Sequence, residues 1–249
     1  MVKVTICGVC GKMGKRIAAL ASRDPELAIA GATEIQGCSL IGVNLGDELK
    51  THNLGVAITA ELDEAMNDAD CVIDFTIPAA TMENVKIAIK HSKPIVIGTT
   101  GFKDAEIEEI KKASENIPVL LSPNMSLGVN VVFGIVAGAA KKLGAGYAVN
   151  LNETHHVHKK DKPSGTGKHL AEIIKKARPD LKEVSIESFR EGEVVGDHKV
   201  VFESEFDTIV ISHSAKTRDI FALGALMAAK FLVGKKNGLY AMKDVLEAI

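Results

Sequence analysis

Short apolar runs alternate with longer amphipathic stretches along the first half of the chain. Residues 2–7 and 27–33 are short apolar runs that predict strands, and a helical spacing of apolar residues follows the first of them as far as Asp24-Pro25. The other elements expected here are strands at 71–75, 94–98 and 119–121, helices at 78–92 and 104–116, and a glycine-rich loop at 36–55. Because strands that alternate with helices form right-handed βαβ units, this half predicts a doubly wound parallel sheet of the α/β class.

The pattern changes after residue 126. A long apolar helix is expected over 127–142, then a strand over 147–154, a histidine-rich segment, and a helix that ends near Arg178. The remaining elements expected are strands at 184–189, 199–206 and 208–213 and a helix at 220–233. Because these three strands follow one another closely, we expect a second domain of the α+β class built on a mixed or antiparallel sheet.

The amino-acid composition indicates what kind of core the protein has and which partners are not expected. Apolar residues make up 46% of the chain and aromatic residues only 4%, so the core must be mostly aliphatic, as in a parallel sheet covered on both faces. A formal net charge of −2 gives no electrostatic reason to expect nucleic acid or an anionic membrane as a partner. We expect no membrane-spanning segment and no signal peptide, and therefore a cytoplasmic protein.

Four cysteines are present, Cys7, Cys10, Cys38 and Cys71. The spacing of the first two, C-x-x-C, is compatible with a redox pair or with half of a zinc site. No second C-x-x-C completes a zinc site, and the pair flanks a glycine at the end of a strand. A nucleotide-binding loop is the better interpretation, with the cysteines as free thiols.

Glycines follow the first strand at a spacing of G-x-x-G-x-x-G. Such a loop lets the backbone approach a pyrophosphate, and the start of the next helix offers N–H groups and a partial positive charge. Glu34 ends the second strand, where a carboxylate would accept hydrogen bonds from an adenosine ribose. The alternative is a glycine turn required only for packing, but its place in the first βα turn favours a Rossmann-type dinucleotide site. Its candidate residues are Gly8, Val9, Cys10, Gly11, Lys12, Met13 and Glu34.

The same residues bear on the choice of dinucleotide. Glu34 repels a ribose 2′-phosphate, and Ile35 beside it is not basic, whereas Lys12, Lys15 and Arg16 would attract a phosphate. We therefore expect NADH as a good cofactor, with NADPH as the alternative.

Two further loops follow predicted strands, where ligands of doubly wound sheets bind. Small residues and hydroxyl groups there suit a nicotinamide and its ribose, although the same residue types also favour ordinary turns. The candidates are Gly98, Thr99, Thr100, Ser122, Pro123, Asn124 and Met125, with Phe75-Thr76 as a weaker one.

A run of histidines and lysines lies between residues 153 and 167. Imidazoles titrate near neutral pH and suit proton transfer. In a strand His156 and His158 would share one face and His155 the other. The spacing H-H-x-H is not a common zinc pattern, so no metal is expected. Ser164-Gly165-Thr166-Gly167 then begins a helix, whose first N–H groups would bind a carboxylate near the imidazoles and Lys159.

These motifs resemble the 4-hydroxy-tetrahydrodipicolinate reductase family, formerly called dihydrodipicolinate reductase. The run E-T-H-H-V-H-K-K-D-K-P-S-G-T-G is similar to the family motif E-x-H-H-x-x-K-x-D-x-P-S-G-T, which is highly specific. The likeness extends over nearly the whole chain, through the motifs at 8–14, 72–76, 98–101, 122–126, 196–198, 211–215, 218, 221–222 and 238–240. Lys160, Lys162, Phe231 and Ile35 depart from the family pattern, and the last leaves a preference for NADPH in doubt.

The resemblance implies an enzyme of lysine and diaminopimelate synthesis. It would reduce a cyclic imine dicarboxylate to tetrahydrodipicolinate with NADH or NADPH, as a cytoplasmic homotetramer. Residues 1–126 with 217–249 would bind the dinucleotide, and 127–216 would bind substrate and form the oligomer. His155 and Lys159 would be catalytic, and His156, Gly165 and Thr166 would bind substrate.

The chemistry expected is hydride transfer to an electron-poor ring carbon, followed by a proton from Lys159 or His155. Another two-domain NAD-dependent dehydrogenase of a small carboxylate is the enzymatic alternative. A non-enzymatic dinucleotide sensor is the other, but it has no use for an array of proton donors.

Overall fold

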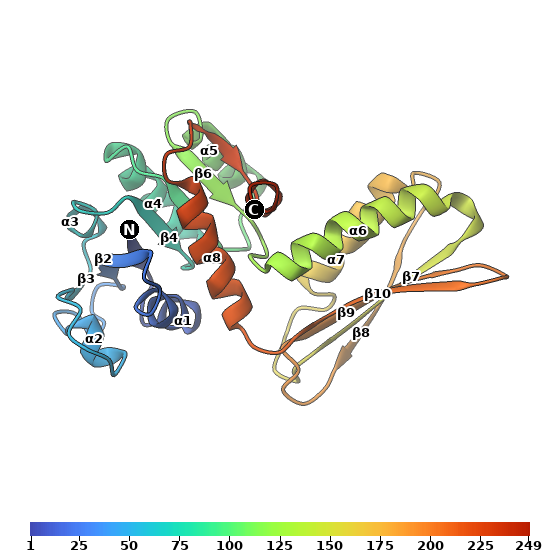
Figure 1. Cartoon of the computed structure of the whole chain (residues 1–249), viewed down its shortest axis with the longest axis horizontal. Helices are drawn as coiled ribbons and strands as arrows, with labels where there is room; N and C mark the ends of the chain where they lie inside the picture. The colour runs from blue at the N-terminus through green and yellow to red at the C-terminus, as the bar shows by residue number, and fades with distance from the viewer. The chain divides into compact units, whose positions relative to one another are not determined.

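The computed structural model describes all 249 residues and divides them into two compact units (Figure 1). The first unit comprises Met1–Met125 and Phe221–Ile249, and the second comprises Ser126–Ile220. The chain therefore leaves the first unit once and returns to it through the helix at Asp219–Leu232.

A seven-stranded, fully parallel sheet forms the centre of the first unit. The strand order is β11-β6-β5-β4-β1-β2-β3, so the chain winds outward from β1 in both directions. The strands are β1 (Val2–Cys7), β2 (Leu27–Thr33), β3 (Ile58–Thr59), β4 (Cys71–Asp74), β5 (Ile95–Ile97), β6 (Pro118–Leu121) and β11 (Gly238–Tyr240). This order confirms the doubly wound parallel sheet that the sequence predicts.

Aliphatic side chains fill the space between this sheet and its helices. Val72, Ile95 and Ile97 from the strands lie in one buried cluster with Val85 of α4 and Ile110 of α5. Burial of each such side chain stabilises the fold by about 1.5–3 kcal/mol relative to exposure. The helices of the unit are α1 (Lys12–Ala21), α2 (Leu45–Glu48), α3 (Leu62–Ala65), α4 (Pro78–Lys90), α5 (Asp104–Ala113), α8 (Asp219–Leu232) and α9 (Met242–Leu246).

The second unit contains a four-stranded mixed sheet in the order β10-β9-β7-β8. Its elements are α6 (Leu127–Leu143), the 3-10 turn η1 (Gly144–Gly146), β7 (Ala148–His155), α7 (Gly165–Ala177), β8 (Ser185–Arg190), β9 (Gly196–Glu203) and β10 (Thr208–Ala215). β7 pairs parallel with β8 and antiparallel with β9. Phe133 of α6 and Leu170 of α7 pack with Leu151, Val200 and Phe202 of the sheet. The mixed sheet of the α+β class is thus confirmed.

Several boundaries differ from the sequence expectation. β9 lies three residues earlier than expected, because Ser204 and Asp207 close a turn through Ser204 N–H to the Asp207 carbonyl at 2.9 Å. Part of the expected loop at 36–55 forms α2, which is capped by the Asn44 side chain. The short elements β3, β11 and α9 have too few residues for a periodic pattern.

The long apolar helix of the second unit bears on the expectation about membrane-spanning segments. Residues 127–146 form a helix long and apolar enough to cross a bilayer by length and composition, with a mean hydropathy of 1.3. Gly, Ala and Val supply that hydropathy without forming a conspicuous run of large apolar residues. Val129, Phe133, Val136 and Ala140 form one face of α6 that is buried in the core of the second unit, whereas only 22% of the stretch as a whole is buried.

Candidate active site

The glycine loop makes a tight turn between β1 and α1. Gly8 has a positive φ of 67°, and a Cβ atom on Gly14 would lie 2.1 Å from the Gly8 carbonyl oxygen. Only glycine therefore allows α1 to begin so close to the end of β1. Gly11 is the N-cap residue of α1 and provides no capping side chain. The backbone at this helix start is the feature that a pyrophosphate requires.

A pocket of about 640 Å³ lies beside this loop. Its wall includes Gly8, Cys10, Gly11 and Glu34 of the expected dinucleotide site, together with Thr33, Ile35, Gln36, Cys38, Phe75 and Thr76. The Cys10 N–H donates a 2.9 Å hydrogen bond to a carboxylate oxygen of Glu34, which joins the loop to the end of β2. Val9 is buried, and Lys12 and Met13 belong to the first turn of α1 and lie outside this wall.

The cysteines of the C-x-x-C spacing have different environments. Cys7 is buried and Cys10 lines the pocket, and both are free thiols. Burial, reinforced by Glu34 and Cys38, raises the pKa of Cys10 to about 12. Cys10 is therefore protonated at neutral pH and a poor nucleophile in this state.

A buried carboxylate organises the ends of β4 and β5. Asp74 accepts hydrogen bonds from the Thr76 N–H at 2.8 Å and from the Asn84 side chain at 2.8 Å. The Thr99 hydroxyl lies 3.4 Å from the same carboxylate. A Cβ atom on Gly98 would lie 2.2 Å from the Phe75 ring, so this glycine leaves room for the aromatic side chain. Sequence reasoning gave Asp74 no role, although it lies in the motif at 72–76 and at the end of a buried strand.

The neighbouring loop after β6 is equally well ordered. The Ser122 hydroxyl donates to the Asn124 carbonyl at 2.8 Å. Gly224 of α8 approaches the Met125 carbonyl so closely that a Cβ atom would lie 1.7 Å from it. β5 and β6 are adjacent parallel strands, so the candidates at 98–100 and 122–125 lie at the same edge of the sheet. Pro123 and Thr100 are exposed there.

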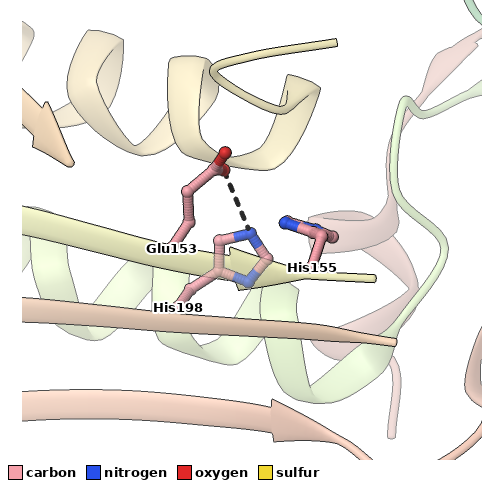
Figure 2. A group of neighbouring side chains, drawn as sticks. All are labelled: Glu153, His155 and His198. Atoms are coloured by element: carbon pink, nitrogen blue, oxygen red, sulfur yellow. Dashed lines mark ion pairs between the residues drawn. The ribbon is translucent and has the colours of Figure 1, made fainter. Parts of the chain in front are cut away.

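In the second unit the end of β7 brings three ionisable side chains together (Figure 2). Glu153 and His155 alternate with outward residues along β7 and therefore face the helices with Leu151. His198 of β9 lies beside them, with its ring centroid 5.2 Å from that of His155. All three are nearly inaccessible to solvent, at 1%, 6% and 6% exposed for Glu153, His155 and His198.

Burial and hydrogen bonding set the charges of this cluster. Burial raises the pKa of Glu153, but hydrogen bonds from the Ser164 side chain and backbone outweigh it, so the net pKa is lowered. Burial lowers the pKa of His155, opposed by the Glu153 carboxylate. Burial lowers the pKa of His198 to about 4. At neutral pH the 3.9 Å contact between His198 Nε2 and Glu153 therefore joins a neutral ring to a carboxylate.

Glu153 also connects β7 to the start of α7. The Ser164 N–H donates to Glu153 at 2.9 Å, and the Ser164 hydroxyl donates to the other carboxylate oxygen. The same hydroxyl accepts the Gly167 N–H at 3.0 Å and so caps α7. Gly165 and Thr166, the expected carboxylate-binding residues, occupy the first turn of this helix, where the helix dipole favours an anion.

Basic side chains line the turn that follows β7. The Lys159 ammonium lies 2.8 Å from Asp161, and the Arg190 guanidinium donates to the Lys159 carbonyl at 3.2 Å. His156 Nε2 lies 3.2 Å from the Arg218 guanidinium. Sequence reasoning gave Arg218 no role, because its partner is 62 residues away in the chain.

The cluster of Glu153, His155 and His198 also has the donor set of a metal site, with one donor atom from each within 4.8 Å of the others. Its surroundings oppose a cation. The Arg190 guanidinium lies 3.7 Å from Glu153, and both carboxylate oxygens already accept hydrogen bonds from Ser164. The expectation of no metal stays a prediction.

Comparison with known families decides the class of protein. The family model described as "Dihydrodipicolinate reductase, N-terminus" matches residues 2–125, and its C-terminal counterpart matches residues 128–246. The chain belongs to the dihydrodipicolinate reductase family. It is therefore an oxidoreductase whose Rossmann-type unit serves a nicotinamide cofactor, as the resemblance in the sequence implied.

Individual relatives cover the whole chain. Proteins named 4-hydroxy-tetrahydrodipicolinate reductase from Desulfotalea psychrophila and Anaeromyxobacter dehalogenans are each 40% identical, over 99% of this chain and 98% of the relative. A dipicolinate-bound dihydrodipicolinate reductase from Paenisporosarcina sp. TG-14 has the same fold, with a TM-score of 0.82, 21% identity and 97% of each chain covered. An amine dehydrogenase from Mycobacterium smegmatis shares the fold at a TM-score of 0.71 and 12% identity, over 97% of this chain and 95% of that one.

Proposed function

We propose that the protein reduces 4-hydroxy-tetrahydrodipicolinate, or its dehydrated form dihydrodipicolinate, to tetrahydrodipicolinate in the synthesis of lysine and diaminopimelate. The observation that carries this proposal is the buried His155 imidazole beside Glu153, whose carboxylate accepts hydrogen bonds from Ser164 at the start of α7. A proton donor beside an anion-binding helix start suits a cyclic imine that carries two carboxylates. The names of relatives that cover almost the entire chain give the same substrate.

The first unit would hold the cofactor. The pyrophosphate would bind at the backbone of Gly8, Cys10 and Gly11, and the adenosine ribose at Glu34, all of which line one pocket. The loops at 98–100 and 122–125 would hold the nicotinamide and its ribose. When bound, the nicotinamide supplies the hydride, and the protein contributes position and electrostatics.

The cofactor would be NADH, with NADPH also possible. Glu34 at the pocket wall repels a 2′-phosphate, and Ile35 beside it is exposed and uncharged. Calorimetric titration with the two reduced dinucleotides tests this choice, and a dissociation constant about a hundredfold lower for NADPH would contradict it.

The second unit would bind the substrate. One carboxylate would lie at Gly165 and Thr166, at the start of α7, with Lys159 and the His156–Arg218 pair supplying positive charge nearby. Arg and His donors recognise a carboxylate through charge-assisted hydrogen bonds. Binding a dianion here replaces water with fixed positive dipoles and charges.

His155 or Lys159 would deliver the proton. In the free protein burial keeps His155 neutral at pH 7, as the lowered pKa indicates. A bound dianion favours the imidazolium by direct charge attraction, so substrate binding would itself load the imidazole with a proton. After hydride transfer this proton would neutralise the enamine-like anion, with His155 and Lys159 holding it at either side.

Each domain would have its own role, and the chain would assemble with copies of itself. Residues 1–126 with 217–249 would form the dinucleotide-binding domain, and residues 127–216 would bind substrate and assemble a homotetramer in the cytoplasm. The partners are then a small dicarboxylate and further copies of the chain.

The test is oxidation of NADH by the purified protein with freshly generated 4-hydroxy-tetrahydrodipicolinate. The reaction is monitored by the loss of the near-ultraviolet absorbance of NADH. We expect turnover with this substrate and none with 2-oxo acids or inositols. Turnover only with another carboxylate would indicate a different dehydrogenase. Dinucleotide binding without any turnover would indicate a sensor.

A further inference from the structure

We propose that Glu153 is a positioning residue that couples the anion-binding start of α7 to the charge state of His155. Its carboxylate would thereby set substrate affinity and the protonation of the proton donor together. This inference rests on the proposed function, because it concerns the same site, but its test below does not require turnover.

The first half of the coupling is geometric. Both oxygens of the Glu153 carboxylate accept hydrogen bonds from Ser164, which is the N-cap residue of α7 and is itself only 2% exposed. A Cβ atom on Gly167 would lie 2.6 Å from the same carboxylate, so a glycine is needed for this close approach. The carboxylate thus fixes where the first turn of α7 begins relative to β7.

The second half is electrostatic. Strand alternation places Glu153 and His155 on the same face of β7, two residues apart. The charged and titratable groups around His155 are Glu153 of β7, Lys159 and Asp161 of the following turn, Arg190 of β8 and His198 of β9. Among these groups Glu153 does most to raise the pKa of His155 and so to favour the imidazolium. Burial, Lys159 and Arg190 lower that pKa.

The position of Glu153 in the cluster explains why one residue can do both. It lies between the helix start and the two imidazoles (Figure 2). The Arg190 guanidinium, at 3.7 Å, favours the ionised carboxylate by charge attraction. None of these contacts is to a reacting atom, so the residue acts through Ser164 and His155.

Two variants separate the halves. Glu153→Gln removes the charge but keeps the shape, and its amide oxygen can still accept the Ser164 N–H. Ser164→Ala keeps the charge but removes the hydroxyl that links the carboxylate to the cap. Both are measured as full-length protein, with dipicolinate as the probe for the anion site and the His155 imidazole proton signal, assigned with His155→Asn, as the probe for protonation.

For Glu153→Gln we expect the midpoint of the His155 titration to fall by about one pH unit, because one adjacent negative charge is lost. Dipicolinate binding should weaken only a few-fold. For Ser164→Ala we expect roughly fivefold to tenfold weaker dipicolinate binding, as for loss of a helix cap, with the titration unchanged. NADH affinity should be the same in both variants and the wild type.

An unchanged His155 titration in Glu153→Gln overturns the electrostatic half. Unchanged dipicolinate affinity in Ser164→Ala overturns the geometric half. This measurement remains a valid test even if Glu153→Gln does not fold. If both variants behave as expected but the wild-type protein does not turn over the reductase substrate, the proposed function is refuted and this inference is left intact.

Discussion

Burial keeps the imidazoles at the end of β7 and near the start of β9 neutral at pH 7. His155 and His198 are each 6% exposed, and burial lowers the pKa of both. His213 of β10 is less buried, and burial lowers its pKa as well. A neutral imidazole can accept a proton from, or share one with, a bound ligand, so burial prepares this site for proton transfer before any ligand arrives.

The same burial makes stability depend on pH. The pKa of His198 is about 4 in the folded chain and 6.5 when unperturbed, so between these values the unfolded chain binds a proton that the folded chain excludes. His198 therefore contributes stability that is fully present above about pH 6.5 and is lost as the pH falls towards about 4. The loss amounts to about 3 kcal/mol at most, by the usual conversion of pKa units. Denaturant unfolding from pH 7 to pH 4 should show this decline.

His198→Gln provides the comparison for that experiment. The amide has no proton to gain in this range, so the decline in the free energy of unfolding should be shallower than in the wild type. An equal slope in the two proteins would mean that other groups cause the acid destabilisation.

His155 and Lys159 provide the direct test of catalysis. His155→Ala should lower kcat far more than it weakens NADH binding, because the imidazole lies in the second unit while the dinucleotide pocket lies in the first. Lys159→Ala should lower kcat by roughly a hundredfold or more, through loss of a general acid. Steady-state kinetics at saturating NADH measures both.

Lys160→Ala is the matched control, because Lys160 is the exposed neighbour of Lys159 and carries the same charge. It should retain near-normal kcat. Near-normal turnover in His155→Ala, or an equal loss in Lys160→Ala, would contradict the assignment of proton donors.

The positions of single candidate residues were more predictable from sequence than the partners of those residues. His155 and Lys159 follow from a specific motif, and the start of α7 follows from Ser164-Gly165-Thr166. The link from Glu153 to His198 was not predictable, because it depends on the register of β7 against β9, which pairs Glu153 directly with His198. Likewise Arg218 reaches His156 only through the fold.

At the scale of elements, strongly periodic segments were predictable and short ones were not. The buried runs at β1, β2 and β4 and the helices α4 to α7 follow from local pattern within a few residues. β11 has three residues and exists because it pairs in parallel with β6, far away in the chain. Such a strand is stabilised by tertiary contact, for which the sequence has no local pattern.

The helix α7 offers a test in which local propensity and tertiary contact oppose each other. Alanine is a better helix former than glycine by about 1 kcal/mol, so propensity alone predicts that Gly167→Ala stabilises the protein. We expect the opposite, because the added methyl group would lie 2.6 Å from the buried Glu153 carboxylate. The free energy of unfolding should fall by about 1–3 kcal/mol, as for overpacking.

Gly165→Ala is the control in the same helix, since nothing lies within 4 Å of a Cβ atom at that position. It should leave stability unchanged or raise it slightly. Equal effects of the two substitutions would show that the close approach of Glu153 to Gly167 does not affect the free energy of unfolding.

At the scale of the whole molecule, the proposed reaction needs groups from both units. The dinucleotide pocket is built entirely from the first unit, and His155, Lys159 and the start of α7 belong to the second. Each unit has its own cluster of buried aliphatic side chains. Hydride transfer nevertheless requires the nicotinamide and the substrate ring in contact. A conformation that brings the ligands together must therefore be favoured when both are bound.

This requirement predicts thermodynamic coupling between the two ligands. Saturating NADH should tighten dipicolinate binding by about fivefold or more, a coupling free energy of about 1 kcal/mol, and dipicolinate should tighten NADH binding by the same factor. Calorimetric titration of each ligand in the presence and absence of the other measures both arms of the cycle. His155→Ala, which leaves the dinucleotide pocket unaltered, should bind NADH alone normally. Independent binding of the two ligands would contradict a conformation that both ligands stabilise together.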